Sequence, residues 1–583
     1  MPIAAPRRVG VAGLLSLLAG ALVLMVAPGN PGALRLAGIG LFWWYAAVAA
    51  PLASVLLVAA VQRSVPASTS RRPMALAIAG WASPMLLALV AAGAFSGEPD
   101  APALALAALV APLLAFVVPT GGRKARLNVV AVIAVGAAVE IVLWANLLLF
   151  ADVAGLLGLP RWAASGLAAL IAFVALELAR ATDAARDATG RARAEGGTAS
   201  RFARAALRGG GITLLYASAL GFVALVALVA LSLVVSPWGA WRALASRSAL
   251  AFSELSPWVT EGRTLTRSTA IDFTEAHRIT ALSPATYRVL ELDRFREGQL
   301  HAGESLALRA GDRLVLDAGA HLRFEAGKRI PGSPTSGVAW ADPPERGGLT
   351  ALGETLGAMV TLVGAALAFV GPRSALGARS VYVGSAILMA LVLSSLSLGV
   401  FGAFAAPGLS IGAPAAAAVF DLPAAIAPGP RGRAFGALGA VVLVVLFAAM
   451  ALALRDVLRR AVRERGQSDA GGAGGVKLVR PLMRLFLVAA WAASLWGGEA
   501  SRALWMGLGL AASATLATRL ADDEPGARLV GSLVGVGAFV ALSILGSRLP
   551  TWAGMLGAYP VLAALPFAWC AARAWGVAAD FHR

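Results

Sequence analysis

The sequence has very few of the side chains that hold redox cofactors or metals. It contains one cysteine, Cys570, in 583 residues. A single thiol cannot close an intrachain disulfide or ligate an iron–sulfur cluster. The four histidines, none of them in an apolar run, are His277, His301, His321 and His582. Walker, GxSxG and HExxH motifs are also absent. We therefore expect no cofactor, no metal site and no catalytic residues, and the protein is not expected to be an enzyme.

Charge is the second scarce feature. Charged residues make up 14% of the chain and apolar residues 59%, with a mean hydropathy of +0.77. Soluble domains have about 25% charged and 45–50% apolar residues. A chain of this length cannot bury so much apolar surface in a water-soluble globule, so the composition predicts a membrane protein.

Runs of about 20 apolar residues predict fourteen transmembrane helices in two sets of seven around a polar stretch. We expect an all-α polytopic membrane protein with one inserted extracytoplasmic β-rich domain, divided into 1–235, 236–348 and 349–583. The predicted spans are 9–27, 36–62, 74–95, 102–120, 127–150, 162–179, 211–235, 349–370, 381–406, 434–454, 481–498, 503–519, 529–547 and 553–575.

The formal charge of +18 is explained by topology. With a cytoplasmic N-terminus, inside segments carry 29 basic residues and the short outside loops carry 6. This positive-inside bias predicts a multi-pass bacterial inner-membrane protein with both termini cytoplasmic and 236–348 periplasmic or extracellular. The insert itself is near neutrality, with 14 basic and 13 acidic residues. The basic segments lack interleaved aromatic residues, so we expect no nucleic-acid partner.

The insert contains an eight-residue repeat that begins with Ala-Gly at 302–303, 310–311, 318–319 and 326–327. Apolar residues alternate after each pair, at Leu306/Leu308, Leu314/Leu316 and Leu322/Phe324. Such alternation predicts short strands with one buried face, and glycine suits the positive φ of the turns. The repeat favours a meander or a few rungs of a small solenoid.

Polar residues inside predicted spans are candidates for function. Glu140 lies thirteen residues into the fifth span and Asn146 six residues further on, so this pair is the candidate intramembrane polar site. Its carboxyl group could bind a cation or relay protons, or could equally be protonated and hydrogen-bonded between helices. Glu177 and Glu354 lie near span ends, where a position at headgroup depth is expected.

Prolines interrupt several predicted spans. Kinks of this kind build the broken helices of transporters, but they also occur in inert spans whose neighbours satisfy the freed carbonyl. The residues are Pro51, Pro84, Pro112, Pro560 and Pro566.

Two cytoplasmic segments are rich in arginine at helical spacing. Their guanidinium groups are candidates for contacts with anionic lipid headgroups or with a partner protein. The candidate residues are Arg186, Arg191, Arg193, Arg459, Arg460 and Arg463. The expected partners are therefore membrane lipids and other protein subunits, the latter through these segments or the 236–348 domain.

Three functions remain open. A transporter or permease without its own ATPase fits fourteen spans and a central insert. A non-catalytic subunit or scaffold of a larger membrane complex explains the scarcity of intramembrane charge. An enzyme acting on lipid-linked substrates would need clustered external acids, but Glu98, Asp100, Asp152 and Asp421 are scattered over the loops between predicted spans. A transporter or permease is the preferred prediction.

Overall fold

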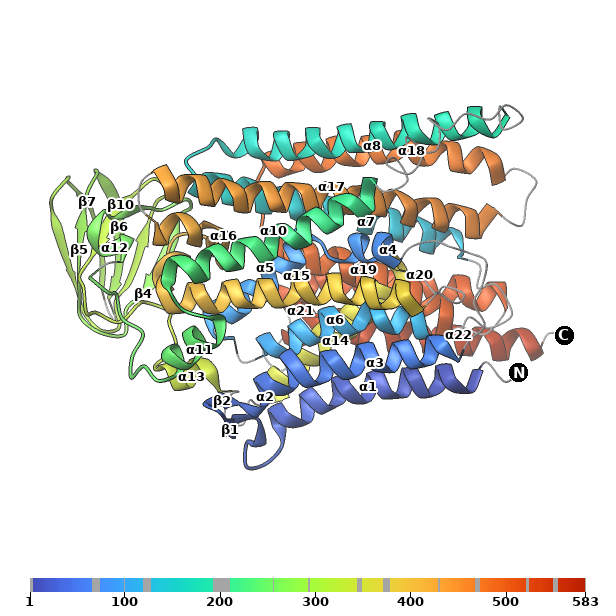
Figure 1. Cartoon of the computed structure of the whole chain (residues 1–583), viewed down its shortest axis with the longest axis horizontal. Helices are drawn as coiled ribbons and strands as arrows, with labels where there is room; N and C mark the ends of the chain where they lie inside the picture. Colours follow the sequence, from blue (N-terminus) through green and yellow to red (C-terminus); the bar gives the residue numbers. More distant parts are fainter. Residues whose placement is uncertain are drawn as a thin grey trace.

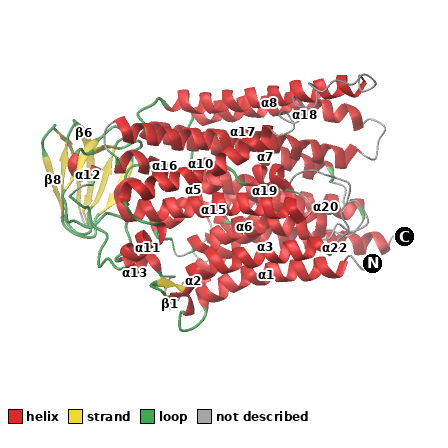
Figure 2. Cartoon of the chain, viewed as in Figure 1, coloured by secondary structure: helices red, strands yellow, loops and turns green. Residues whose placement is uncertain are grey.

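A long bundle of helices carries a small β-rich unit at one end (Figures 1 and 2). The computed structural model describes all residues except 1–3, 65–73, 99, 119–126, 192–209, 255, 292–293, 343–348, 371–377, 428–429, 467–471, 521–523, 549–553 and 582–583. Both chain ends lie at the end of the bundle opposite the β-rich unit (Figure 1). We call these two ends the β-domain end and the termini end.

The first half of the bundle contains nine helices in the described residues. They are α1 (Ala4–Val26), α2 (Leu41–Trp44), α3 (Ala50–Arg63), α4 (Met74–Trp81), α5 (Pro84–Ser96), α6 (Ala101–Val117), α7 (Val129–Leu156), α8 (Arg161–Arg191) and α10 (Gly210–Leu233). A π-helical turn, Tyr45–Ala49, joins α2 to α3.

The second half also contains nine helices in the described residues. They are α14 (Leu349–Phe369), α15 (Ala378–Ala405), α16 (Ala415–Ile426), α17 (Pro430–Gly466), α18 (Gly472–Leu495), α19 (Ala500–Leu520), α20 (Pro525–Leu545), α21 (Gly554–Ala558) and α22 (Val561–Phe581).

Eleven helices in the described ranges are long and apolar enough to cross a membrane, and α5, α6 and α16 are shorter apolar helices. The chain is thus a mostly α-helical polytopic membrane protein with a separate small β-sheet region. Each of the fourteen predicted ranges coincides with helical structure, whereas the number of crossings stays a prediction. Helix α16 was not expected, because twelve residues are too few for the span pattern.

The predicted span 74–95 is broken in the middle. Helix α4 ends at Trp81 and α5 begins at Pro84, because proline lacks an N–H and disfavours helical backbone in the residue before it. The Ser83 hydroxyl accepts from the N–H of Leu86 at 3.1 Å and so caps α5. The predicted span 553–575 is likewise split, between α21 and α22 at Tyr559–Pro560.

The β-rich unit consists of two antiparallel four-stranded sheets. Their strand orders are β3-β10-β5-β8 and β4-β9-β6-β7. The strands are β3 (Arg263–Thr264), β4 (Thr269–Asp272), β5 (His277–Ala281), β6 (Ala285–Glu291), β7 (Arg294–Leu300), β8 (Ser305–Leu308), β9 (Arg313–Leu316) and β10 (His321–Phe324). Three short helices flank them: α11 (Pro237–Ala245), α12 (Pro257–Thr260) and α13 (Gly337–Ala341).

The repeat folds differently from the expected meander or solenoid. Strands β8, β9 and β10 come from successive repeats, but they alternate between the two sheets and never pair with one another. The predicted apolar alternation is confirmed, since all six apolar residues of the three repeats are buried in one core shared by both sheets. The turn glycines have positive φ, from 77° to 93°. The pattern identified the buried face correctly but not the partner of each strand.

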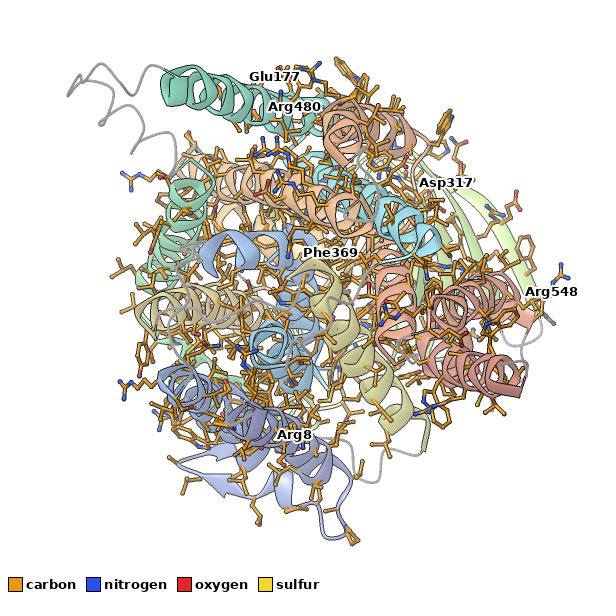
Figure 3. The ribbon with its side chains drawn as sticks, turned by 90° about the vertical axis from the view of Figure 1, so that its right-hand side faces the viewer. Arg8, Glu177, Asp317, Phe369, Arg480 and Arg548 are labelled. Atoms are coloured by element: carbon orange, nitrogen blue, oxygen red, sulfur yellow. The ribbon has the colours of Figure 1, made fainter. Side chains whose placement is uncertain are left out.

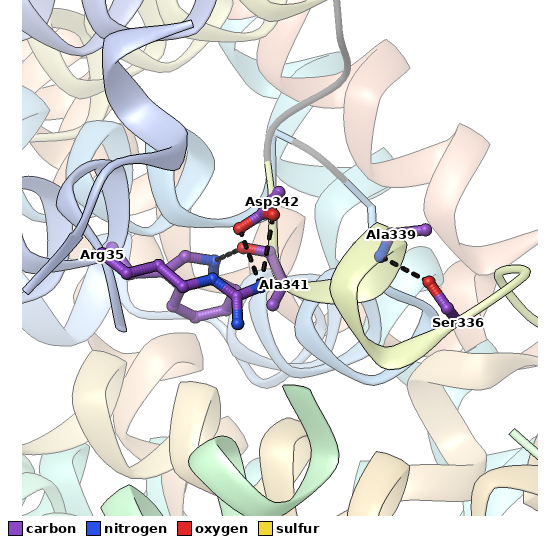
Figure 4. Close-up of polar contacts among 6 residues, drawn as sticks. Arg35, Ser336, Ala339, Ala341 and Asp342 are labelled. Carbon is purple, nitrogen blue, oxygen red and sulfur yellow. Dashed lines mark hydrogen bonds and ion pairs between the residues drawn. The ribbon is translucent and has the colours of Figure 1, made fainter. Parts of the chain in front are cut away.

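Two groups of contacts fix the β-rich unit to the bundle. On one side, Trp258 Nε1 donates to the carbonyl of Gly408 at 2.6 Å, and Arg263 forms an ion pair with the buried carboxylate of Asp421 in α16. On the other side, Trp43 Nε1 donates to the carbonyl of Ala341 at 2.9 Å, and Arg35 pairs with Asp342 at 3.2 Å (Figure 4).

Candidate functional site

A cavity of about 570 Å³ opens among helix ends from both halves of the bundle. We call it the acidic vestibule. Its walls come from α5 and α6 in the first half and from α14, α19, α20, α21 and the α21–α22 connection in the second. Its polar and aromatic lining residues are Glu98, Asp100, Glu499, Ser501, Arg502, Trp505, Phe539, Ser543 and Tyr559.

The vestibule lies at the β-domain end. Trp340 in α13, next to the β-rich unit, donates its indole N–H to the carbonyl of Ala94 in α5 at 3.0 Å. Gly97 then turns the chain with a φ of 70°, and a Cβ at this position would lie 2.2 Å from the Trp340 ring. Glycine is therefore required here by both backbone conformation and space. This turn brings Glu98 and Asp100 to the vestibule wall.

Carboxylates outnumber cations in the vestibule. Burial raises the pKa of Glu98 to about 7, and the neighbouring carboxylates of Asp100 and Glu354 add to the shift. The Glu98 side chain is exposed to the vestibule, but protein surrounds this space closely enough to desolvate the charge. Burial also raises the pKa of Asp100, with a further contribution from Glu354. With a pKa of about 7, Glu98 exchanges its proton near neutral pH.

Aromatic packing shapes the far wall of the vestibule. The rings of Trp505 and Tyr559 meet edge to face with centroids 5.5 Å apart. Tyr559 sits against Gly357 of α14, where a Cβ would lie 2.6 Å from the tyrosine Cβ. Ser501 donates to Glu499 at 2.8 Å and orients that carboxylate. Aromatic faces beside carboxylates are a favourable environment for an organic cation.

The predicted pair Glu140 and Asn146 lies outside this cavity. Asn146 is fully buried in α7; its Oδ1 accepts from the N–H of Met85 at 2.9 Å, and its Nδ2 donates to the carbonyl of Val142 at 2.7 Å. Asn146 thus caps the broken end of α5. Glu140 is partly exposed, and no hydrogen bond or ion pair joins it to Asn146 in the described part of the chain. Its functional role stays a prediction.

The six predicted arginines differ in their surroundings. Arg460 donates to the carbonyls of Phe369 and Val370, both at 2.5 Å, and so caps the end of α14. Arg459 lies 3.7 Å from the carboxylate of Asp456, one helical turn away, and Arg463 is exposed. Arg186 and Arg191 lie in α8, but their side chains fall outside the described set, as does the whole of Arg193.

Three of the other acids that the sequence singled out, Glu177, Asp152 and Asp421, form ion pairs with arginines. Arg484 of α18 makes a charge-assisted contact with Glu177 of α8, with Nε 2.7 Å from the carboxylate; Glu177 is labelled beside Arg480 in the view of the termini end (Figure 3). Asp152 pairs with Arg161 at 2.7 Å. Glu98 and Asp100, two residues apart in one turn, line the same cavity as Glu499, whereas Asp152 and Asp421 lie elsewhere. No local sequence signal links them to Glu499 or Tyr559, which lie about 400 residues later.

In the described residues, no group of three or more His, Cys, Asp or Glu side chains is arranged to hold a metal ion. No protein-family model matches this sequence, and no curated protein is significantly similar to it. The interpretation of function therefore depends on the geometry of the chain itself.

Proposed function

We propose that this membrane protein is a permease-type transporter component, without its own ATPase or redox cofactor, that admits a cationic solute through the acidic vestibule. The observation that carries the proposal is the vestibule itself, in which carboxylates from both halves of the chain and aromatic rings from the second half surround one cavity. Ligand sites of transporters lie between such halves. Following the distribution of arginines, we propose that the β-domain end faces the cell exterior.

Two further features support a transporter. The first is the break between α21 and α22, where Tyr559 and Pro560 line the vestibule. Broken helices at the substrate site are typical of secondary transporters. The second is Glu98, whose pKa of about 7 suits a group that releases a proton when a cation binds and recovers it when the cation leaves.

The charges and the cavity size limit the class of substrate. Glu98, Asp100 and Glu499 face a single guanidinium group, that of Arg502, so the cavity favours a net positive ligand. A volume of about 570 Å³ is within the ~300–1,000 Å³ of small-molecule sites. We propose a protonated amine, whose ammonium group would lie between Glu98 and Asp100 and whose apolar part would pack on Trp505 and Tyr559.

Thermal-shift titrations of the purified protein with methylammonium, choline and putrescine test this proposal. At pH 8 we expect at least one amine to raise the Tm. Glu98→Gln should lower the affinity for that amine about tenfold, because it removes one charge-assisted contact. The matched control is Asp317→Asn, which removes an exposed carboxylate from the β-rich unit and should leave binding unchanged. Equal binding of amines and of carboxylate anions would contradict the proposal.

A second candidate, a subunit of a larger complex, is favoured by the outer edge of the β-rich unit. Strand β7 pairs only with β6 among the described strands, which leaves seven residues of open edge. Phe295 is 59% exposed and stands opposite Leu290, which is 44% exposed. Exposed apolar residues on an open edge invite a further strand. A stoichiometric co-purifying chain that is lost with Phe295→Asp would favour this function over the first.

A further inference from the structure

A second and larger cavity lies where the β-rich unit meets the bundle. We call it the junction cavity. It has a volume of about 1,210 Å³, above the ~300–1,000 Å³ typical of sites for drug-sized ligands. Its floor is formed by the ends of α7, α10, α15, α16 and α17, and its roof by residues 247–263 around α12. None of its lining residues belongs to the acidic vestibule.

The floor of the junction cavity is apolar. Each side chain comes from the last turn of a helix or from the connection after it, at the depth where a bundle leaves the hydrocarbon for the headgroup region. The residues are Leu156, Leu157, Leu159, Leu233, Phe404 and Ile426. Leu159 is 54% exposed, and on α10 Leu231 is 75% exposed. The apolar floor therefore continues onto surface that faces lipid.

One arginine of the cavity lining, Arg247, forms no ion pair with any carboxylate in the described part of the chain. The guanidinium carbon of Arg247 lies 4.9 Å from the centroid of the Phe404 ring, and burial lowers the pKa of Arg247. By contrast, Arg263 is neutralised by Asp421. Glu261 also lines the cavity and, with Asp421, equals the two lining arginines in number, so Arg247 is distinguished by its position over Phe404 and not by an excess of positive charge.

We propose that the junction cavity binds an anionic phospholipid from the surrounding bilayer, with its phosphate on Arg247 and its acyl chains on the leucine floor. A half-buried guanidinium above an apolar surface gains from a phosphate partner. A cavity of about 1,210 Å³ has room for acyl-chain segments above the leucine floor. Because the floor continues onto lipid-facing residues of α10, the bilayer itself is the source of the ligand. The bound lipid would seal the β-rich unit against the bundle, independently of any solute in the vestibule.

Native mass spectrometry of the full-length protein, delipidated and then titrated with phosphatidylglycerol or phosphatidylcholine, tests the proposal. We expect one phosphatidylglycerol to bind about tenfold more tightly than phosphatidylcholine. Arg247→Gln should abolish this preference, and Arg247→Lys should retain most of it. The matched control is Arg242→Gln, which removes an exposed arginine from the neighbouring helix α11 and should leave the preference unchanged.

A second variant tests the floor rather than the charge. Ala437 lines the cavity and is exposed, so Ala437→Trp should fill part of the volume and displace the lipid while the fold, checked by Tm, is preserved. Equal affinity for both phospholipids in the unmodified protein would overturn the proposal, as would an unchanged preference in Arg247→Gln. A tighter complex with a polyprenyl phosphate than with phosphatidylglycerol would overturn the assignment to a bilayer phospholipid.

Discussion

The acidic vestibule and the junction cavity lie at the same end of the molecule but differ in their balance of charged side chains: carboxylates are in excess in the first, and the two signs are equal in number in the second. The vestibule has three carboxylates against one guanidinium. In the junction cavity Arg263 and Asp421 cancel each other, which leaves Arg247 and the other lining carboxylate, Glu261. Both are partly desolvated spaces, where an unpaired charge is costly and gains from a ligand of opposite sign. The carboxylate excess of the vestibule therefore favours a cation, whereas in the junction cavity it is the position of Arg247 over Phe404, without an ion pair in the described residues, that favours an anion.

The largest expected effect is loss of the ion pair that closes the junction cavity. Asp421→Asn leaves the guanidinium of Arg263 without a counter-charge at a site where Asp421 is 3% exposed. Breaking such a buried pair costs about 3–5 kcal/mol, and we expect a clearly lower Tm together with faster proteolysis between the β-rich unit and the bundle. Asp342→Asn, which breaks the more exposed pair with Arg35, should cost less than about 1 kcal/mol. Equal effects of the two variants would contradict the buried role of Asp421.

A smaller loss of stability is expected from Asn146→Ala, a change in the helix that caps α5 beside the vestibule. Asn146→Ala removes the acceptor for the N–H of Met85 and leaves a buried donor unsatisfied, at a cost of about 1–3 kcal/mol. Because α5 leads directly to Glu98, we expect amine binding to weaken while binding of phosphatidylglycerol at the junction cavity stays the same. Titrating both ligands against the variant measures the two effects together. A loss of both bindings would mean that the cavities are not independent.

Each of the two charge variants, tested against both ligands, should weaken the binding of only one of them. Glu98→Gln should weaken amine binding about tenfold, or about 1.4 kcal/mol, without changing the phospholipid preference. Arg247→Gln should do the reverse. A four-way titration by thermal shift and native mass spectrometry checks both. If either variant changed the binding of both ligands equally, the two cavities would not bind their ligands independently.

The pH dependence of stability should differ between the protein and Glu98→Gln. The folded-state pKa of Glu98, about 7, lies above its ordinary value of 4.5. The folded protein therefore binds more protons in this window, and stability falls as the pH rises from about 4.5 to about 7. Glu98→Gln removes this contribution, so its Tm relative to the unmodified protein should increase by roughly 1–2 °C between pH 5 and pH 8. A constant difference across this range would contradict the shifted pKa.

The smallest effect is expected from Glu140→Gln. Glu140 lines neither cavity, so binding of both ligands should be unchanged within error. Transport is a separate measurement in the same variant. Loss of flux with intact binding would establish Glu140 as part of a proton or cation path, whereas normal flux would assign it a packing role in α7.

Periodicity and composition predicted those parts of the fold that depend on local pattern. The buried alternation from Leu306 to Phe324 and the apolar helices could be identified from the sequence. Each face of such an element has one kind of surroundings, and the residue types on that face reflect it. The break at Ser83–Pro84 has a local signal in its proline. The cap supplied by Asn146 has none, because its acceptor role depends on an N–H 61 residues away. The pairing of β8, β9 and β10 depends on which sheet each strand joins. The same alternation of apolar residues fits a strand in either sheet, so the sequence does not distinguish them.

The candidate site was harder to predict than the fold. Glu98 and Asp100 stand two residues apart in one short turn, but the sequence does not show which other carboxylates lie near them. In the fold Glu354 raises the pKa of Glu98, and Glu499 lines the same cavity. Distant helices bring these carboxylates close, and packing at Gly357 against Tyr559 positions the opposite wall. Arg247 was one of many arginines in the sequence, and only its half-buried position over Phe404 distinguishes it from its solvated neighbours.

The most direct test of the permease assignment is a current measurement on proteoliposomes adsorbed to a solid support. At pH 8, a concentration jump of the amine that binds most tightly should produce a transient current in the unmodified protein. The current should be strongly reduced in Glu98→Gln and preserved in Asp317→Asn. A current equal to that of empty liposomes, in protein that still binds the amine, would contradict transport and leave the vestibule as a binding site only.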